Sequence, residues 1–181
     1  MAPDPACGVD DTPRRQRRFL GWTRDIAIAF VVFLVVAHWR EKDLAQDFAP
    51  SFSAPLSTGV TVTLQQWLEQ HPEKPVVLHF WASWCGVCSI MDGMMNSVAR
   101  DWPVRGVALQ SGDMAAVQAH NRKEKLGFES FIDNDGSIAR ALGVSAVPST
   151  FIITPDGRIA SASTGLLSAW GLRLQLWWTE R

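Results

Sequence analysis

Apolar and polar positions change their pattern near residue 58. Beyond this point, short apolar runs alternate with segments of helical periodicity, which predicts strands alternating with helices. The run Val76–Ala82 is apolar almost throughout, as in a strand covered on both faces of a sheet. Two later strands, 149–154 and 158–164, are joined by a Pro-Asp-Gly turn and should form an antiparallel hairpin. We therefore expect residues 58–181 to form one α/β domain, a three-layer sandwich around a mixed sheet.

The helices between these strands carry recognisable end signals. Thr63 is placed to cap the first helix, and Asp113 to cap a later one. Further helices are expected over about 87–100 and 167–178. The apolar residues that share one side of the last helix are Leu167, Trp170, Leu174 and Trp177 or Trp178. We expect this stripe to pack in the core.

Before residue 58 there is one apolar run, Ile26–Trp39, with arginines on its N-terminal side. A helix of this length reaches about 21 Å, short of the roughly 30 Å hydrocarbon core. The arginines place the N-terminal end in the cytoplasm, and Trp22 and Trp39 suit the two membrane interfaces. We expect a signal-anchor transmembrane helix over 19–39 that holds the following domain on the periplasmic side of a bacterial inner membrane.

Two alternatives to the anchor stay open. Val35 and Ala37 offer small residues that a signal peptidase accepts, so the run also suits a cleaved signal peptide. It also suits a buried helix of a soluble protein. Residues 1–18, rich in proline and charge, predict a disordered cytoplasmic tail, and residues 40–57 mix charge, serine and proline as a linker does.

Composition excludes some classes of function. The formal net charge is -1, whereas a nucleic-acid-binding protein needs a clustered basic face, so we expect no nucleic-acid partner. Three cysteines are too few for a disulfide scaffold. Cys7 precedes the apolar run and lies across the membrane from the other two if that run spans, so we interpret it as an incidental thiol.

The other two cysteines, Cys85 and Cys88, lie between a predicted buried strand and a predicted helix. Unpaired N–H groups and the helix dipole favour a thiolate at this point, which lowers the pKa of Cys85 and makes it the nucleophile. One turn later, Cys88 can resolve the mixed disulfide that Cys85 forms. Structural zinc takes four ligands and no second pair exists, so we expect neither a metal nor another cofactor. Cu(I) held by two thiolates and a purely structural disulfide stay open.

The stretches FWASWCGVC at 80–88 and GVSAVPSTF at 143–151 together resemble the thioredoxin superfamily. This resemblance implies a thioredoxin-like fold in which a cis Val147-Pro148 bond faces the disulfide and pairs with extended substrates. The long segment between Cys88 and Pro148 leaves room for an extra strand and helix, which resembles the membrane-tethered TlpA and ResA branch. Within that branch, VALQSGD and WGLRLQLWW are similar to protein disulfide oxidoreductases of the suppressor for copper sensitivity protein D type.

The resemblance implies a membrane-anchored periplasmic thiol-disulfide oxidoreductase that acts on protein thiols and disulfides. It also implies a membrane thiol reductant or oxidant as partner and a link to copper tolerance. Trp84 would form an apolar wall beside Cys85, and Val147 and Pro148 would bind substrate. The alternatives are a Cu(I)-binding module on the same cysteines and a cytochrome c maturation thiol reductase. Met91 stands where the ResA-type pattern often has Glu, which weakens the second alternative.

His79 lies six residues before Cys85, where thioredoxins carry a buried acid beneath the disulfide. We hypothesise that His79 relays a proton to or from Cys88, because the pKa of imidazole lies near neutrality. The alternative is a packed strand histidine with its hydrogen bonds satisfied. Gly86 and Val87 place no cationic side chain between the thiols, so we expect a couple less oxidising than that of a dedicated oxidase.

Overall fold

The computed structural model describes residues 25, 26, 28–32, 44, 45 and 47–181. The chain divides into two compact units, residues 1–39 and residues 40–181. In the first unit, the described residues are helical. Within the described part of the chain, no helix is both long and apolar enough to cross a membrane. The predicted tail and most of the predicted transmembrane helix fall outside the described residues.

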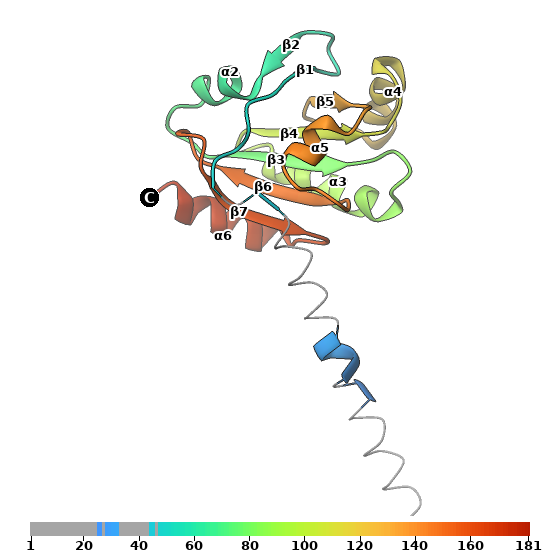
Figure 1. Ribbon diagram of the computed structural model, residues 1–181, viewed down its shortest axis with the longest axis vertical. Coiled ribbons are helices and arrows are strands. Elements are labelled where there is room, and N and C mark those ends of the chain that lie inside the picture. The colour runs from blue at the N-terminus through green and yellow to red at the C-terminus, as the bar shows by residue number, and fades with distance from the viewer. Residues whose placement is uncertain (1–24, 27, 33–43, 46) are drawn as a thin grey trace, which may run out of the picture. The chain divides into compact units, whose positions relative to one another are not determined.

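A mixed sheet of five strands forms the centre of the second unit (Figure 1). Its strands, in spatial order, are β5 (Ser130–Asp133), β4 (Val104–Leu109), β3 (Val76–Trp81), β6 (Ser149–Ile153) and β7 (Ile159–Thr164). Strands β3, β4 and β5 run parallel, while β6 is antiparallel to β3 and forms the predicted hairpin with β7. Every residue of β3 is buried, which confirms the central, doubly covered strand.

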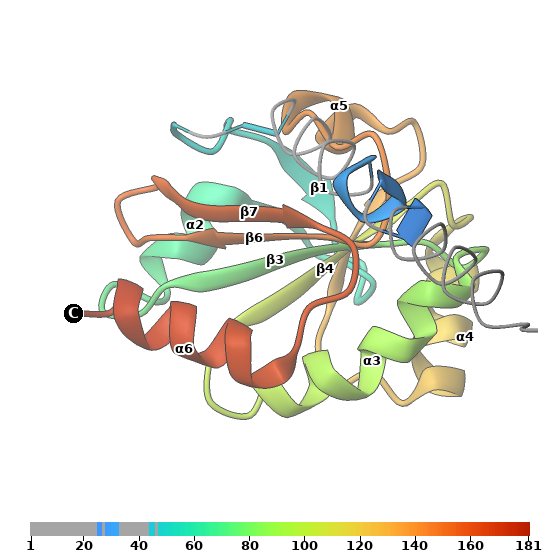
Figure 2. The same cartoon turned by 90° about the horizontal axis from the view of Figure 1, so that it is seen from below.

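Helices cover both faces of this sheet (Figure 2). On one face, α3 (Gly86–Val98) and α6 (Ala169–Thr179) pack their apolar sides against β3 and β6. On the other face lie α2 (Leu64–Glu69) and α5 (Ser137–Ala141). The predicted three-layer sandwich with a mixed sheet is therefore confirmed.

The segment between Cys88 and Pro148 holds the predicted extra strand and helix. Helix α4 (Met114–Glu124) leads from β4 into β5, which extends the sheet at one edge. Asp113 caps α4 by accepting a hydrogen bond from the Ala116 N–H at 2.9 Å, as predicted. Thr63 likewise caps α2, in a capping box with Gln66.

The linker prediction is wrong for the described residues between 44 and 57, because these residues pack on the domain. The Ala45 N–H donates to the Leu142 carbonyl oxygen at 3.0 Å. Strand β1 (Ser53–Pro55) pairs antiparallel with β2 (Thr61–Thr63). The segment also adds three apolar side chains to the core, namely Leu44, Ala54 and Leu56. Burial of these few apolar residues outweighs the serine and proline content that suggested a linker.

The prediction that one stripe of the last helix packs in the core is also wrong for most of its members. The exposed residues are Trp170 at 84%, Leu174 at 63%, Trp177 at 41% and Trp178 at 76%. The buried side of α6 is instead formed by Leu172 and Leu176, while Leu167, before the helix, is half-buried against the same core. Arg173 fixes this rotation, because its Nη2 lies 2.8 Å from Asp101 Oδ2 and donates to the Ser97 carbonyl oxygen at 2.7 Å.

Truncation of two leucines in α6 tests this orientation. We expect Leu176→Ala to lower the free energy of unfolding by about 2–5 kcal/mol, because it leaves a cavity in a packed core. The matched change Leu174→Ala, on the exposed side of the same helix, should alter it by less than about 0.5 kcal/mol. Urea unfolding of the two variants and the parent protein provides the comparison, and equal losses would contradict the orientation described above.

Candidate functional site

A disulfide joins Cys85 and Cys88 where β3 leads into α3. Cys85 is the N-cap residue of α3, and its Sγ accepts a hydrogen bond from the Cys88 N–H at 3.2 Å. Cys88 is only 2% exposed, whereas Cys85 is half-buried. A protein substrate can therefore reach the sulfur of Cys85, while Cys88 lies behind it.

The end of α3 that carries Cys85 favours negative charge on this sulfur. The first N–H groups of a helix have no partner within the helix and carry the positive end of its dipole. Helix α3 has no acidic residue in its first turn that would oppose this effect. When the disulfide is reduced, the helix therefore stabilises the thiolate of Cys85 relative to the thiol.

A loop far away in the sequence faces the disulfide. The Val147-Pro148 peptide bond is cis, and the Val147 carbonyl oxygen lies 3.8 Å from Cys85 Sγ. The Gly165 N–H donates to the Pro148 carbonyl oxygen at 2.8 Å, which ties this loop to the end of β7. The structure thus confirms the cis bond and its place beside the cysteines. Because Pro148 is buried, the half-buried Val147 is the part of this loop left open to a substrate.

Several apolar residues close to Cys85 in the sequence have exposed side chains. Trp84 is 62% exposed, and in the first turns of α3 Val87 and Ile90 are 44% and 70% exposed. Such a cluster around a reactive sulfur suits contact with apolar segments of another protein. Trp84 was predicted as an apolar wall, and Ile90 extends the apolar surface beyond that prediction.

Beneath the disulfide, Trp81 occupies the core as its strand position predicts. It shares an apolar cluster with Cys88, and its Nε1 donates to Ser130 Oγ at 3.1 Å. Its ring stacks on that of His120 with 4.5 Å between centroids. A side chain at Gly106 would lie 2.6 Å from Trp81 Nε1, so this position has room only for glycine.

His79 lies in the middle of β3 and is completely buried. Its Nδ1 is 3.0 Å from Thr150 Oγ1, while its Nε2 has no hydrogen-bond partner. Burial lowers the pKa of His79 to about 4, so the imidazole is neutral at pH 7. Its hydrogen bond thus goes to Thr150 rather than to a cysteine, and the proton relay stays a prediction.

Asp92 is a buried carboxyl near the site that the sequence reasoning missed. It lies one turn after Cys88 on the buried side of α3, is 4% exposed, and has no partner for Oδ2. Burial, followed by repulsion from Glu124, raises the pKa of Asp92 to about 6. The signal was present in the sequence, since an aspartate stands four residues after Cys88 within a stripe that is otherwise apolar.

The raised pKa of Asp92 makes a prediction about stability. A carboxyl with a raised pKa stabilises the fold when protonated, and this contribution is lost as the pH rises through about 6. We expect Asp92→Asn to raise the free energy of unfolding by about 2 kcal/mol at pH 7.5 and to change it little at pH 4. Urea unfolding at the two pH values measures this, with the exposed Glu73→Gln as the control. A gain of the same size at both pH values would contradict the assignment.

Among the described residues, no group of three or more His, Cys, Asp or Glu side chains is placed to hold a metal ion. The two sulfurs are instead bonded to each other. In the reduced protein, the two thiolates suit a soft metal such as Cu(I), which two sulfur ligands can hold.

An accessible sulfur at a helix start, a buried partner sulfur and a facing cis-proline loop define a thioredoxin-like thiol-disulfide oxidoreductase. Residues 45–162 match the model described as AhpC/TSA family, and the chain belongs to this family. It is 34% identical over 154 residues to a thioredoxin-like protein of Haemophilus influenzae, covering 84% of this chain and 90% of that protein. It is 25% identical over 146 residues to the thiol-disulfide oxidoreductase ResA of Bacillus subtilis, covering 78% and 79% of the two chains.

Solved structures agree with this assignment. A candidate thiol:disulfide interchange protein DsbE from Chlorobium tepidum superposes with a TM-score of 0.64 at 27% identity, covering 76% of this chain and 99% of that chain. The protein is therefore a protein disulfide oxidoreductase of the ResA and DsbE type. Its class of substrate is protein thiols and disulfides.

Proposed function

We propose that this protein is a membrane-anchored enzyme that exchanges disulfides with protein substrates in the periplasm. One observation carries the chemistry: the accessible Cys85 sulfur faces the Val147 carbonyl at 3.8 Å, with Cys88 buried behind it. The anchor and the compartment are supported by the sequence, in which arginines precede the apolar run Ile26–Trp39.

In the reductive direction, the thiolate of Cys85 attacks a substrate disulfide. One substrate sulfur leaves as a thiolate, and Cys85 is joined to the other in a mixed disulfide. Cys88 then loses its proton and attacks Cys85 Sγ, which restores the Cys85–Cys88 disulfide and releases the second substrate thiolate. Two electrons pass from the protein to the substrate, and the same steps in reverse oxidise a dithiol. A membrane thiol reductant or oxidant would reset the pair after each turnover.

The apolar surface and the cis-proline loop together shape the substrate site. An extended substrate segment can pair its backbone with the backbone at Val147, as peptides do when they add to a sheet edge. Its apolar side chains can contact Trp84 and Ile90, which are both exposed. This arrangement selects substrates that present a cysteine in an unfolded or extended segment.

Trapping of mixed disulfides in cells tests the proposal. We expect Cys88→Ser to accumulate covalent adducts with periplasmic proteins, because Cys85 still attacks but nothing resolves the product. Cys85→Ser should accumulate none, because the buried Cys88 is out of reach of substrates. Both variants carry Cys7→Ser, and adducts are identified by mass spectrometry after non-reducing electrophoresis. Equal adducts from both variants would overturn the roles, and adducts with cytoplasmic proteins alone would overturn the compartment.

The proposed relay by His79 has its own test. If His79 passes a proton to or from Cys88, His79→Phe should slow the exchange with a model disulfide and change its pH profile. Thr150→Val, which removes only the hydrogen bond to His79, is the matched control. Stopped-flow exchange and thiol pKa values of the reduced protein are the measurements. Unchanged rates and pKa values in His79→Phe would leave His79 as a packed strand residue.

The link to copper tolerance remains part of the proposal and is supported by the similarity of two stretches to the copper-sensitivity type. Retention of Cu(I) by the reduced protein separates a copper-binding module from a redox enzyme. The cytochrome c maturation alternative is weaker, because Met91 is 1% exposed and packs in the core. An apolar thioether there cannot act as the carboxyl of the ResA-type pattern.

A further inference from the structure

Resolution of the mixed disulfide requires Cys88 to lose a proton inside the core. Only its thiolate displaces the substrate from Cys85. The Cys88 side chain belongs to an apolar cluster with Trp81, Ala108 and Val117, and burial among such side chains disfavours a thiolate. Cys85 is the N-cap of α3 and is stabilised by the helix dipole, whereas Cys88 lies one turn further along. A base beside Cys88 would therefore speed this step.

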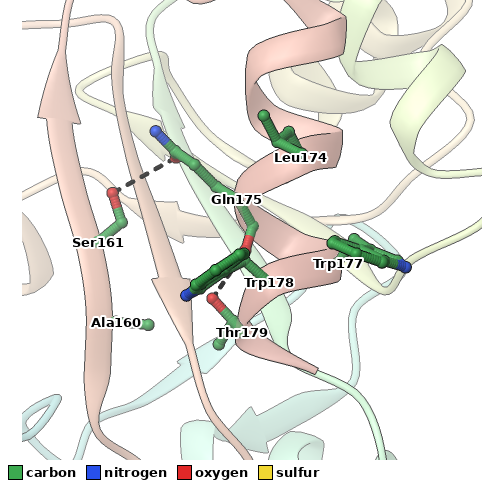
Figure 3. A pocket seen from close by; sticks show the side chains of 7 residues that line it. All are labelled: Ala160, Ser161, Leu174, Gln175, Trp177, Trp178 and Thr179. Atoms are coloured by element: carbon green, nitrogen blue, oxygen red, sulfur yellow. Dashed lines mark hydrogen bonds between the residues drawn. The ribbon is translucent and has the colours of Figure 1, made fainter. Parts of the chain in front are cut away.

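The groove between α6 and β7 supplies no such base. It has a volume of about 410 Å³ and is lined by residues of both elements (Figure 3). None of these described lining residues has an acidic or basic side chain. The candidates are instead the buried titratable groups around α3.

One row of side chains on α3 faces helix α4. Both helices connect parallel strands, and right-handed crossovers that run in the same direction place them on the same face of the sheet (Figure 2). Residues 88, 92 and 96 are spaced by four and form the row. At one end, Cys88 packs in a cluster with Val117 of α4. At the other end, Asn96 Nδ2 donates to the Lys125 carbonyl oxygen at 2.9 Å, where α4 ends. Asp92, between these two contacts, faces α4 as well.

Asp92 is well placed to take a proton from Cys88. Side chains four residues apart on a helix have Cβ atoms about 5–6 Å apart, which permits transfer directly or through one water. Asp92 is 4% exposed and its Oδ2 has no hydrogen-bond partner, so this oxygen can receive a proton. With a pKa of about 6, Asp92 is largely ionised at pH 7 and still basic enough to accept one.

Charged groups on α4 act on Asp92. Burial has the larger effect on its pKa, and repulsion from Glu124 raises the pKa further. A hydrogen bond from Lys123, whose Nζ lies 2.9 Å from Glu124 Oε1, lowers the pKa of Glu124 and keeps it ionised. Burial lowers the pKa of His120 on α4 and of His79 on β3, so both imidazoles are mainly neutral at pH 7. Among these groups, Glu124 is the anion that opposes ionisation of Asp92.

We propose that Asp92 accepts the proton of Cys88 when the mixed disulfide is resolved, and that Glu124 on the extra helix α4 controls the charge of Asp92. The Cys88 proton moves to Asp92 Oδ2, and the Cys88 thiolate attacks Cys85 Sγ. The bond between Cys85 and the substrate sulfur breaks as the Cys85–Cys88 disulfide forms, and the substrate leaves as a thiolate. Asp92 then loses its proton to solvent. The proposal rests on the proposed roles of the two cysteines.

Stopped-flow oxidation of the reduced full chain by glutathione disulfide, in detergent micelles, tests the role of Asp92. All proteins carry Cys7→Ser. The rate depends on glutathione disulfide concentration while attack by Cys85 is limiting, and it levels off at the rate constant for resolution. Mass spectrometry of acid-quenched samples distinguishes the mixed disulfide from the final disulfide. The two steps are therefore measured separately in each protein.

We expect Asp92→Asn to lower the rate constant for resolution at least about tenfold at pH 7, because it removes a general base. The rate constant for attack should change less than about twofold, because the helix dipole still stabilises Cys85. In the parent protein, resolution should accelerate as the pH rises through about 6, and Asp92→Asn should lack this rise. The difference between the two proteins should narrow at pH 9.5, where hydroxide generates the thiolate without a base.

A second variant tests the role of helix α4. Glu124→Gln removes the repulsion and lowers the pKa of Asp92, so the rise in the rate of resolution should move to lower pH. The exposed Glu73→Gln removes one negative charge elsewhere and should leave the rise in place. An unchanged midpoint in Glu124→Gln would overturn the role of Glu124.

The remaining outcomes separate this inference from the proposed function. If the parent protein forms the mixed disulfide and never resolves it, the proposed role of Cys88 fails and the inference fails with it. If the parent protein and Asp92→Asn resolve equally fast at pH 7, the inference alone is overturned. Equal slowing of attack and resolution would indicate a structural effect and also overturn it. A loss confined to His79→Phe would assign the proton to His79 instead.

Discussion

The redox site depends on the antiparallel pairing of β3 with β6. In this register Phe80 lies opposite Ser149, so the C-terminal end of β3 and the N-terminal end of β6 lie side by side at the same end of the strands. Cys85 follows the first strand and Pro148 precedes the second, which brings the sulfur and the cis-proline loop together. A slip of one residue would turn every side chain of the buried β3 to the wrong face, so the core itself fixes the geometry of the site.

The same core contains two buried polar groups that lower the stability of the fold. His79 Nε2 and Asp92 Oδ2 are both buried without a hydrogen-bond partner, at a cost that an apolar residue would avoid. Their titrations act in opposite directions. Protonation of His79 opposes folding as the pH falls towards 4, while ionisation of Asp92 opposes folding as the pH rises through 6. Groups that reduce stability in this way are often retained near reactive centres.

The sequence predictions that the structure confirms depend on local patterns. The continuous apolar run of β3, the Pro-Asp-Gly hairpin and the cap at Asp113 each depend on a few neighbouring residues. The cysteine pair and Pro148 were found from motifs, although only the fold could show that they meet. The predictions that failed depended on distant contacts. Nothing local reveals that Leu44 packs in the core, or which apolar side of α6 faces the sheet, and Asp92 lies within a stripe of apolar residues that hides its importance.

The pairing of residues 47–49 with the start of β7 has a mechanical consequence. A pull on the N-terminal segment acts first on the buried Leu44 and on the hydrogen bond from the Ala45 N–H to the Leu142 carbonyl oxygen. It then acts on the two backbone hydrogen bonds that join Asp47 to Ile159 and Ala49 to Gly157. These bonds lie at the far end of the hairpin from the cis-proline loop, so they can open while the strands beside the disulfide stay paired. The pairing at the start of β7 can therefore be lost without separating the strands that hold the disulfide and the cis-proline loop together.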